Sequence, residues 1–202
     1  MRHGETAWNH QRRYQGHRDV PLSLTGRWQA ERVAGRLAGE KLRAVYSSDL
    51  QRARQTAEAI ARLHGLRVLA RPGWREMDFG EWEGYTHAEI AERYPDLLPR
   101  WLKEVAAVRV PGGETLQEVQ ARAMGEWKEI TAAHPGGTLA VVAHGGIIRV
   151  LLLTLQGEPL SSFWDLVVGP ASVSVVVGEE GRFRVVTIND CSHLDRKGSK
   201  PN

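Results

Sequence analysis

The sequence predicts an α/β fold in three layers, with helices on both faces of a mainly parallel central sheet. Residues 43–48 (RAVYSS) and 138–144 (TLAVVAH) are short, β-branched runs that end in small or polar residues, as buried strands do. Segments with helical periodicity alternate with these runs, and such alternation is typical of a parallel sheet. The length of 202 residues suits one compact domain with a sizeable core.

The first two predicted helices flank the strand at 43–48. The first spans 23–39, where Ser23 is a suitable N-cap and Gly39 a suitable end. The second lies within 47–65 and closes at Gly65. In each helix the apolar residues recur on one face. These positions are Ala30, Val33, Ala34 and Leu37 in the first helix, and Ala53, Ala57, Ile60 and Ala61 in the second.

The second half of the chain supplies two further helices and a hairpin. The third helix lies within 114–137 and ends before Pro135, which cannot continue it. The fourth, at 147–157, is apolar nearly all round, which predicts burial. Residues 172–190 are expected to form two strands joined by a tight turn at Glu180 and Gly181.

We expect one domain over residues 1–194. Residues 85–112 are predicted to form a helical insertion that acts as a lid and contributes to substrate choice. The polar tail, 195–202, is expected to be frayed.

Composition excludes several classes of protein. The net charge of +3 is only a mild excess of basic residues. A nucleic-acid-binding protein is expected to carry a strong basic patch instead. The chain has no apolar run near the roughly 20 residues that span a bilayer, and its polar N-terminal residues predict no signal peptide. Cys191 is the only cysteine, so neither a disulfide framework nor a thiolate metal cluster is expected. A cytoplasmic protein is the simplest interpretation.

Basic and imidazole side chains gather where predicted strands end. Arg2 and His3 open the chain, Arg52 follows one strand and His144 follows another. The carboxyl ends of parallel strands share one edge of the sheet, where ligands bind. Two guanidinium groups and two imidazoles around one point repel each other unless an anion joins them. A phosphoryl group offers oxygens that accept bidentate arginine hydrogen bonds, so we expect a phosphate site.

A histidine among arginines also suggests covalent catalysis. A neutral imidazole nitrogen can attack phosphorus and form a phosphohistidine, which divides one displacement into two easier steps. The leaving alkoxide then needs a proton from an acid. Residues 74–84 (WREMDFGEWEG) supply candidate carboxyl groups, namely Glu76, Asp78, Glu81 and Glu83. Nearby phosphate charge favours the protonated form of such a group.

The motifs together resemble the histidine phosphatase superfamily, in its phosphoglycerate-mutase-like branch. They are RHGET at 2–6, SSDLQRARQTA at 47–57, REMDFGEWEG at 75–84, GGET at 112–115 and AHGG at 143–146. The resemblance implies an α/β fold and a site that needs neither a metal ion nor an organic cofactor.

The resemblance also implies roles for particular residues. His3 would be the phosphorylated nucleophile, and Arg2, Arg52 and His144 would hold the phosphoryl oxygens. Glu76 would be the proton donor, although Asp78 and Glu81 could fill the same role. Asn9, Gln15 and Gly145 match positions that line the phosphate pocket.

The start of the chain departs from the family pattern. Family members usually carry an apolar strand before the RHG motif, and here only Met1 precedes it. Either the natural start lies upstream, which we favour, or the fold forms without that strand.

The favoured function is hydrolysis of a small phosphorylated metabolite by a phosphoric monoester hydrolase of the histidine acid-phosphatase type. The alternatives are a phosphoglycerate mutase, an α-ribazole-phosphate phosphatase and a non-catalytic phosphate-binding relative. No nucleic-acid or membrane partner is expected, whereas an exposed sheet edge would support a homodimer.

The remaining histidines and most tryptophans are interpreted as structural or surface residues. Four aromatic residues close to the motifs are candidates for the wall of the leaving-group pocket, namely Trp8, Tyr14, Trp82 and Tyr85.

Overall fold

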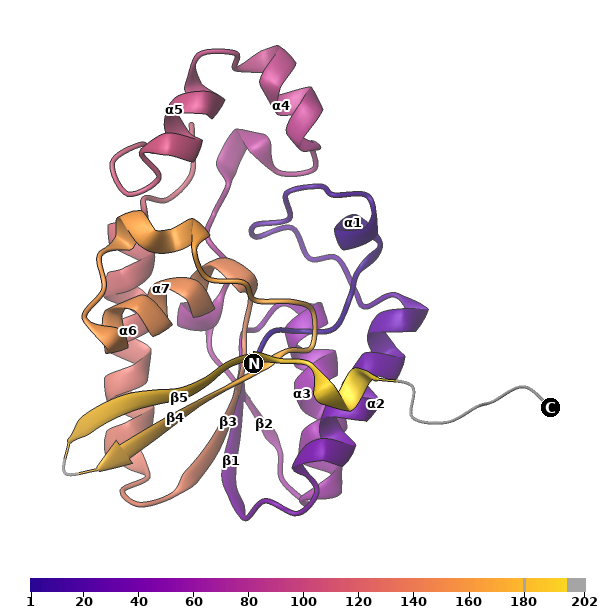
Figure 1. Ribbon diagram of the computed structural model, residues 1–202. Helices are drawn as coiled ribbons and strands as arrows, with labels where there is room; N and C mark the ends of the chain where they lie inside the picture. The colour runs from indigo at the N-terminus through magenta and orange to yellow at the C-terminus, as the bar shows by residue number, and fades with distance from the viewer. Residues whose placement is uncertain (180, 196–202) are drawn as a thin grey trace.

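The computed structural model describes residues 1–179 and 181–195, and it places a parallel sheet between two layers of helices (Figure 1). Strand β1 (Leu42–Ser47) is central, and β2 (Val68–Ala70) and β3 (Thr138–Val142) pair with it in parallel on either side. The carboxyl ends of these strands therefore lie along one edge of the sheet.

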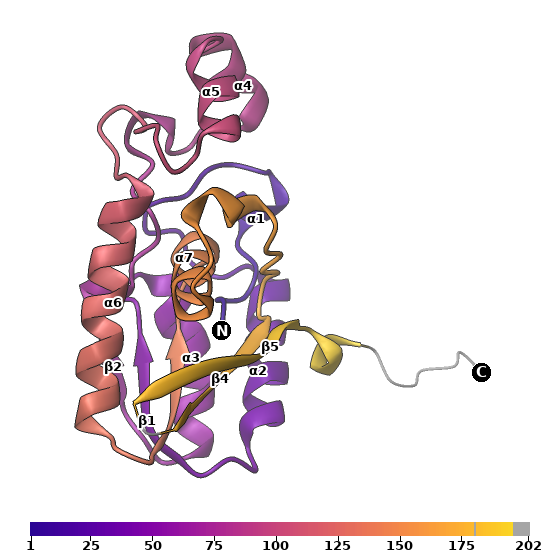
Figure 2. The same ribbon diagram turned by 60° about the vertical axis from the view of Figure 1, so that its left-hand side comes forward.

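Helices cover both faces of this sheet. Helices α2 (Leu24–Leu37) and α3 (Gln51–Leu63) lie on one face, and α6 (Leu116–Ala133) and α7 (Gly145–Gln156) lie on the other. Figure 2 shows the sheet between α6 and the α2–α3 pair. This arrangement confirms the predicted three-layer α/β fold.

Alternation along β1 explains why both faces are covered. Ala44 and Tyr46 belong to the buried cluster that includes α6 and α7, whereas Val45 belongs to the cluster that includes α2 and α3. Successive side chains of a strand point to opposite faces, so an apolar strand needs a helical layer on each side.

Local signals fix the helix ends. The Ser23 side chain accepts a hydrogen bond from the Gly26 amide at 3.0 Å and caps α2. Thr115 and Glu118 form a capping box at the start of α6. Gly157 ends α7 with φ of 74°, a conformation that glycine adopts without strain.

The starts of two helices differ from the predicted ones. Helix α3 begins at Gln51 because Ser47 still belongs to β1 and Leu50 is the N-cap residue. Helix α7 begins at Gly145, two residues before the predicted start at Ile147.

The first residues of the chain lie beside β3. Arg2 forms a parallel bridge with Ala143, and the His3 amide donates to the Ala143 carbonyl at 3.0 Å. On the other side, the Ala171 amide donates to the His3 carbonyl at 2.9 Å, and the Arg2 amide donates to the Ser172 carbonyl at 3.1 Å. Backbone pairing on both sides therefore holds His3 at the edge where β1 and β3 end.

The predicted hairpin is also present. Strands β4 (Val173–Glu179) and β5 (Arg182–Asp190) pair antiparallel, with Glu179 opposite Arg182. Glu180, part of the predicted turn, lies outside the described residues, as do residues 196–202 of the predicted tail.

Two short helices fall within the predicted lid. They are α4 (His87–Arg93) and α5 (Leu97–Lys103), and both figures place them at the far end of the molecule, beyond α1 (Ala7–His10). Single 3₁₀ turns complete the described structure, at Pro72–Trp74, Gly80–Trp82, Leu160–Trp164 and Ser192–Leu194.

Candidate active site

A pocket of about 290 Å³ lies at the strand-end edge of the sheet. Its walls come from segments far apart in the sequence: the first residues of the chain, the loop at 9–16, the start of α7, and residues 163–164. Arg52 from α3, together with Glu76 and Phe79 from the acid-rich segment at 74–84, completes it. The structure thus brings Arg2, His3, Arg52 and Glu76 together around one cavity.

His3 is held as a neutral imidazole with one nitrogen available. Its side chain is buried, and Nδ1 lies 2.6 Å from the carbonyl oxygen of Gly4. A carbonyl only accepts hydrogen bonds, so Nδ1 carries the ring proton and Nε2 keeps a lone pair. Burial, followed by the charges of Arg52 and Arg2, lowers the pKa of His3 well below its ordinary value. The site therefore contains a neutral imidazole whose Nε2 has a free lone pair.

Arg52 fixes the tautomer of the second histidine. Its Nε donates to Nδ1 of His144 at 3.1 Å, so that nitrogen must be an acceptor and the ring proton sits on Nε2. The two histidine rings stand edge to face, with 5.0 Å between the centroids of His3 and His144. The Nε2 atom of His144 is shielded from solvent and has no hydrogen-bond partner in the described part of the chain. The Nε2–H group of His144 is therefore a donor without an acceptor, on a ring that packs against His3.

The guanidinium of Arg52 is oriented by backbone carbonyls. Its terminal nitrogens donate to the oxygens of Arg18 at 2.7 Å and Gly16 at 2.8 Å. The side chain is fully buried on α3, and burial lowers the pKa of Arg52 to about 10. It stays charged at neutral pH and cannot turn away from the pocket without losing these bonds.

Arg2 approaches the start of α7. One terminal nitrogen donates to the Val168 carbonyl at 2.6 Å, while Nε is shielded and has no partner among residues 1–179 and 181–195. A Cβ built on Gly145 would lie 3.6 Å from the central carbon of this guanidinium. Burial lowers the pKa of Arg2, and the charge of Glu76 opposes that shift.

Glu76 lies on the N-terminus of α7. Its Oε1 accepts hydrogen bonds from the amides of Gly146 at 2.9 Å, Ile147 at 3.1 Å and Met77 at 3.0 Å. A helix N-terminus favours a negative charge, which explains why the carboxylate settles there. The first amides of α7 are therefore occupied by the side chain of Glu76 in this structure.

The other candidate acids lie elsewhere. Asp78 accepts from the Gly80 amide at 2.8 Å and caps a tight turn, and Glu81 accepts from the hydroxyl of Tyr94 near the surface. Among these three carboxyl groups, only Glu76 lines the described pocket.

Arg122 on α6 clamps the segment that carries Glu76. Its terminal nitrogens donate to the carbonyl oxygens of Gly73 at 2.9 Å, Arg75 at 2.6 Å and Glu76 at 2.8 Å. The same guanidinium binds both oxygens of Glu114, at 2.8 and 2.9 Å. Arg122 belongs to none of the sequence motifs, and its role emerges only from its contact with Glu114 of the GGET motif.

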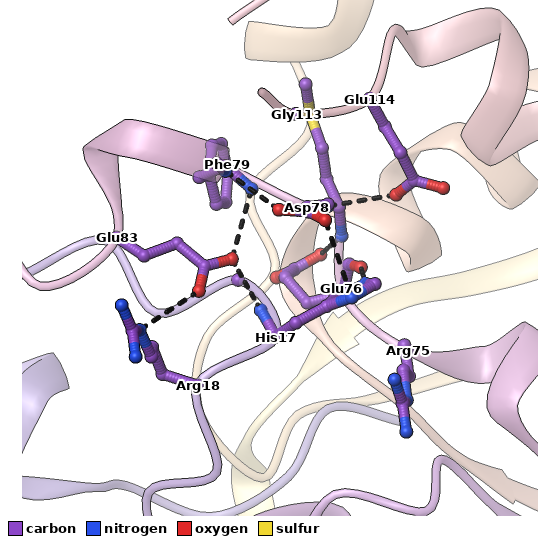
Figure 3. Close-up of polar contacts among 12 residues, drawn as sticks. His17, Arg18, Arg75, Glu76, Asp78, Phe79, Glu83, Gly113 and Glu114 are labelled. Carbon is purple, nitrogen blue, oxygen red and sulfur yellow. Dashed lines mark hydrogen bonds and ion pairs between the residues drawn. The ribbon is translucent and has the colours of Figure 1, made fainter. Parts of the chain in front are cut away.

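Figure 3 shows the remaining supports of this segment. Glu114 also accepts from the Asp78 amide at 2.9 Å, and Nε2 of His17 lies 3.0 Å from the Glu76 carbonyl, to which it must donate. His17, interpreted from the sequence as a surface or structural residue, therefore holds the backbone of the acid.

Glu83 is a nearly buried carboxylate that links this segment to Arg52. It accepts from the amides of His17 at 2.7 Å and Phe79 at 3.3 Å, and burial raises its pKa. Gly16, at φ of 49°, touches it so closely that a Cβ there would overlap the carboxylate. The carbonyl of Gly16 is one of those that orient Arg52. Glu83 thus holds the loop on which the position of Arg52 depends.

Thr6 positions the side-chain amides of Asn9 and Gln15, two of the predicted pocket residues. Oδ1 of Asn9 accepts from the Thr6 amide at 3.0 Å, and Oε1 of Gln15 accepts from the Thr6 hydroxyl at 2.9 Å. Both side chains line the pocket, and with their oxygens engaged, their NH₂ groups are the donors left for a ligand. Gly145 lines the same pocket.

The aromatic wall differs from the expected one. Of the four predicted residues Tyr14 lines the pocket, whereas Trp82 is fully buried in the core. Phe79, Phe163 and Trp164 supply the rest of the wall.

Arg149 also lines the pocket, and sequence analysis did not single it out. It carries the only charge in the otherwise apolar run 147–156 (IIRVLLLTLQ), and this exception is a signal that could have identified it.

No group of three or more His, Cys, Asp or Glu side chains in the described ranges is placed to hold a metal ion. No helix in the same ranges combines the length and apolar character needed to cross a membrane.

Comparison with known proteins shows the family of the chain. Residues 1–191 match the histidine phosphatase superfamily (branch 1). Phosphoserine phosphatase 1 of Hydrogenobacter thermophilus is 38% identical over 194 residues, with 96% of this chain and 92% of that protein covered.

Solved structures are similar along nearly the whole chain. Bacillus stearothermophilus YhfR superposes with a TM-score of 0.92 at 33% identity, covering 96% of both chains. A mycobacterial glucosyl-3-phosphoglycerate phosphatase in complex with VO₃ superposes with a TM-score of 0.86 at 34% identity, covering 93% of this chain and 96% of that one. The match over residues 1–191 and the identity to phosphoserine phosphatase 1 place this chain in the histidine phosphatase superfamily (branch 1).

Proposed function

We propose that this protein is a metal-independent phosphomonoesterase that hydrolyses a small phosphorylated metabolite through a phosphohistidine at His3. The observation that carries the proposal is the neutral, buried imidazole whose Nδ1 is committed to the Gly4 carbonyl. Its free nitrogen shares one pocket with Arg2, Arg52 and Glu76. Relatives named as phosphatases support the same class of reaction.

In the first step, Nε2 of His3 attacks phosphorus and the ester P–O bond breaks. The alkoxide leaves with a proton from the carboxyl group of Glu76, so an alcohol is released and a phosphohistidine forms. Burial keeps His3 unprotonated and therefore nucleophilic, and Nδ1–H remains bonded to Gly4 throughout.

In the second step, water attacks the phosphohistidine. The carboxylate of Glu76 accepts a proton from this water, the P–N bond breaks, and inorganic phosphate leaves. His3 and Glu76 return to their starting states, so the cycle consumes one water and needs no co-reactant.

Preorganised donors stabilise the charge that develops on the phosphoryl oxygens. The orphaned Nε of Arg2 and the orphaned Nε2–H of His144 are available without breaking any bond in the described structure. The NH₂ groups of Asn9 and Gln15 add neutral donors. Donors fixed before reaction cost no reorganisation, which makes them effective in a buried site.

The test is hydrolysis of p-nitrophenyl phosphate in the presence of EDTA. We expect wild-type turnover to persist with the chelator and the His3→Ala variant to lose it. His10→Ala is the matched control, because His10 is exposed on α1 and lies outside the pocket.

A rapid quench of the wild type should trap a protein-bound phosphoryl group that is stable in alkali and labile in acid. Turnover that survives in His3→Ala, or that disappears with EDTA, would refute the proposal. Transfer of the phosphoryl group to another hydroxyl, without release of inorganic phosphate, would indicate a mutase instead.

A further inference from the structure

The peptide group between Gly4 and Glu5 decides which nitrogen of His3 carries the ring proton. Its carbonyl oxygen, that of Gly4, accepts from Nδ1 of His3 at 2.6 Å. If this carbonyl turned away, the proton could move to Nε2, and the lone pair would then lie on Nδ1, on the side of the ring that adjoins Gly4. The nucleophilic tautomer therefore depends on the orientation of one backbone carbonyl.

The same peptide group is held at its other end by a side chain of α2. The amide of Glu5 donates to Oε1 of Gln29 at 2.8 Å. A peptide group is planar and trans, so its C=O and N–H bonds point in opposite directions and turn together. The bond to Gln29 therefore also fixes the direction of the Gly4 carbonyl. Among the described residues, His3 and Gln29 are the two that form hydrogen bonds to this peptide group.

The neighbouring peptide groups do not depend on Gln29. Each of them is held at both ends, by hydrogen bonds of 2.9 to 3.1 Å. For the group before Gly4 the partners are Ala171 and Thr56, and for the group after Glu5 they are Ser23 and Asn9. Loss of the bond to Gln29 would thus release one peptide group while the chain on both sides stays in place.

Two glycines bring Gln29 within reach of this loop. A Cβ on Gly4 would overlap the carbonyl of Gly26, and a Cβ on Gly26 would overlap the carbonyl of Glu5. The loop that carries His3 therefore lies directly against the first turn of α2. Gly26 and Gln29 are three residues apart and share one face of the helix, so the side chain of Gln29 reaches the same loop.

Removal of the Gln29 oxygen would leave the Glu5 amide without its acceptor. An amide that is shielded from water and has no partner is costly, and rotation of the peptide group toward another acceptor relieves that cost. The same rotation carries the Gly4 carbonyl away from Nδ1 of His3. A defect at Gln29 is therefore transmitted to the nucleophile through one rigid plane.

We propose that Gln29 is a positioning residue for the nucleophile: by fixing the peptide group between Gly4 and Glu5, it holds His3 in the tautomer whose Nε2 can attack phosphorus. This inference rests on the proposed phosphatase function. It gives a part in the reaction to α2, a helix whose side chains do not line the described pocket.

The first measurement is the tautomer of His3 in the ¹⁵N-labelled full chain at neutral pH. Long-range ¹H–¹⁵N correlation spectra separate protonated from unprotonated ring nitrogens, and the His3 signals are those that His3→Ala lacks. We expect the wild type to carry the proton on Nδ1. In Gln29→Met, which keeps the length of the side chain but not the acceptor, we expect both tautomers, with the two ring nitrogen shifts drawn toward each other.

Two further variants of Gln29 test whether the acceptor is what matters. Gln29→Glu keeps an acceptor oxygen and should keep the wild-type tautomer. Gln29→Lys offers only donors and should behave like Gln29→Met. It also keeps the comparison available if the methionine variant does not fold.

The second measurement is kcat/KM with p-nitrophenyl phosphate and with glycerol 3-phosphate. Attack by His3 belongs to the first step with either leaving group, so Gln29→Met should lower both values by the same factor. We expect about 10- to 100-fold, the usual range when a partner that orients a functional side chain is removed. The inhibition constant of inorganic phosphate should stay within about twofold of the wild-type value, because Arg2, Arg52 and His144 are held by other bonds.

Gln55→Met is the matched control. Oε1 of Gln55 also accepts from one backbone amide, that of Leu22, at 2.9 Å, and Gln55 is half-buried like Gln29. This variant should keep the His3 tautomer and both values of kcat/KM within about twofold. The melting temperature of each variant shows whether it is folded.

The outcomes separate the inference from the function on which it rests. A wild-type tautomer in folded Gln29→Met and Gln29→Lys, or unchanged kcat/KM in both, would overturn the role of Gln29 alone. A loss of activity with an equal weakening of phosphate inhibition would also overturn it, because that pattern indicates a general distortion of the pocket. Absence of His3-dependent hydrolysis in the wild type would overturn the phosphatase proposal itself, and the spectra would still decide whether Gln29 fixes the tautomer.

Discussion

Replacement of Gly146 by alanine tests whether the first turn of α7 sets the position of Glu76. Gly146 has helical backbone angles, so alanine fits the conformation. A Cβ built there would lie 2.6 Å from Oε1 of Glu76 and 3.3 Å from its carboxyl carbon. The carboxyl group must retreat by roughly 0.5–1 Å to reach ordinary contact distance. It would then lose the bonds from Gly146 and Ile147, now 2.9 and 3.1 Å long.

The expected magnitudes follow from two opposing effects. Alanine in place of glycine stabilises a helix by about 0.5–1 kcal/mol. Hydrogen bonds to a charged group contribute about 1.5–3 kcal/mol each, and the retreating carboxyl keeps its bond to Met77. The loss of two such bonds, offset in part by the helical gain, gives a net decrease of about 2–5.5 kcal/mol in the free energy of unfolding, and the melting temperature of the variant reports whether it is folded. Displacement of a catalytic group by about 1 Å costs roughly 100-fold in rate.

The loss of activity in Gly146→Ala should depend on the leaving group of the substrate. Hydrolysis of an alkyl phosphate such as glycerol 3-phosphate needs the proton from Glu76, so its kcat/KM should fall about 100-fold. Nitrophenolate leaves without a proton, so kcat/KM for p-nitrophenyl phosphate, which reports only the steps up to nitrophenolate release, should change by less than about fivefold. Its kcat also includes the second step, in which Glu76 is the base, and is therefore expected to fall. Steady-state kinetics with both substrates supply the measurement.

Gly125→Ala is the matched control for the added methyl group. Gly125 lies in α6, where a Cβ would meet nothing within 4 Å. It should gain about 0.5–1 kcal/mol in stability and keep wild-type kinetics with both substrates. Equal losses with alkyl and aryl phosphates in Gly146→Ala, or no loss with either, would refute the assignment of Glu76 as the proton donor held by α7.

Other predictions concern charge and pH. Arg52→Lys keeps the charge but not the fork that engages His144 and two backbone carbonyls, so kcat/KM for p-nitrophenyl phosphate should fall about 100- to 1,000-fold. Burial lowers the pKa of His3 and of His144 in the native state. Below about pH 6.5 these two histidines are therefore protonated in the unfolded chain but stay neutral in the native state. The free energy of unfolding, measured with urea, should be level above that pH and decrease below it by up to about 2.7 kcal/mol per unit. His144→Asn should roughly halve this slope.

The layers of the fold could be predicted because each helix carries its own periodicity. Helices α2, α3, α6 and α7 were located from apolar spacing and capping residues, which are local signals. Strand β2 was not predicted, because three residues are too few to show a period and its pairing with β1 depends on tertiary contact. The homodimer, the cytoplasmic location and the lid function of residues 85–112 stay predictions.

The inner part of the site could be predicted for a geometric reason. His3, Arg52 and His144 each follow a strand or pair beside one, and the carboxyl ends of parallel strands meet. Residues that act through other side chains could not be found in this way. Arg122 and Glu83 work by holding backbone atoms of distant segments, and the sequence gives no spacing that predicts such contacts.

The opposite charge that Glu76 supplies to the guanidinium groups could not be predicted from the sequence. From the sequence, two guanidinium groups at one point are expected to repel each other unless an anion binds. In the structure, the carboxylate of Glu76 provides a negative charge close to both Arg2 and Arg52. This has a consequence for the reaction cycle. A phosphoryl group that enters the pocket takes over the neutralisation of Arg2 and Arg52 and places negative charge beside Glu76. The carboxyl group is then driven toward its protonated form, the form that the departing alkoxide requires. On this proposed mechanism, binding the substrate and loading the acid are a single electrostatic event, because one carboxyl group is both the counter-ion of the empty pocket and the proton donor of the filled one.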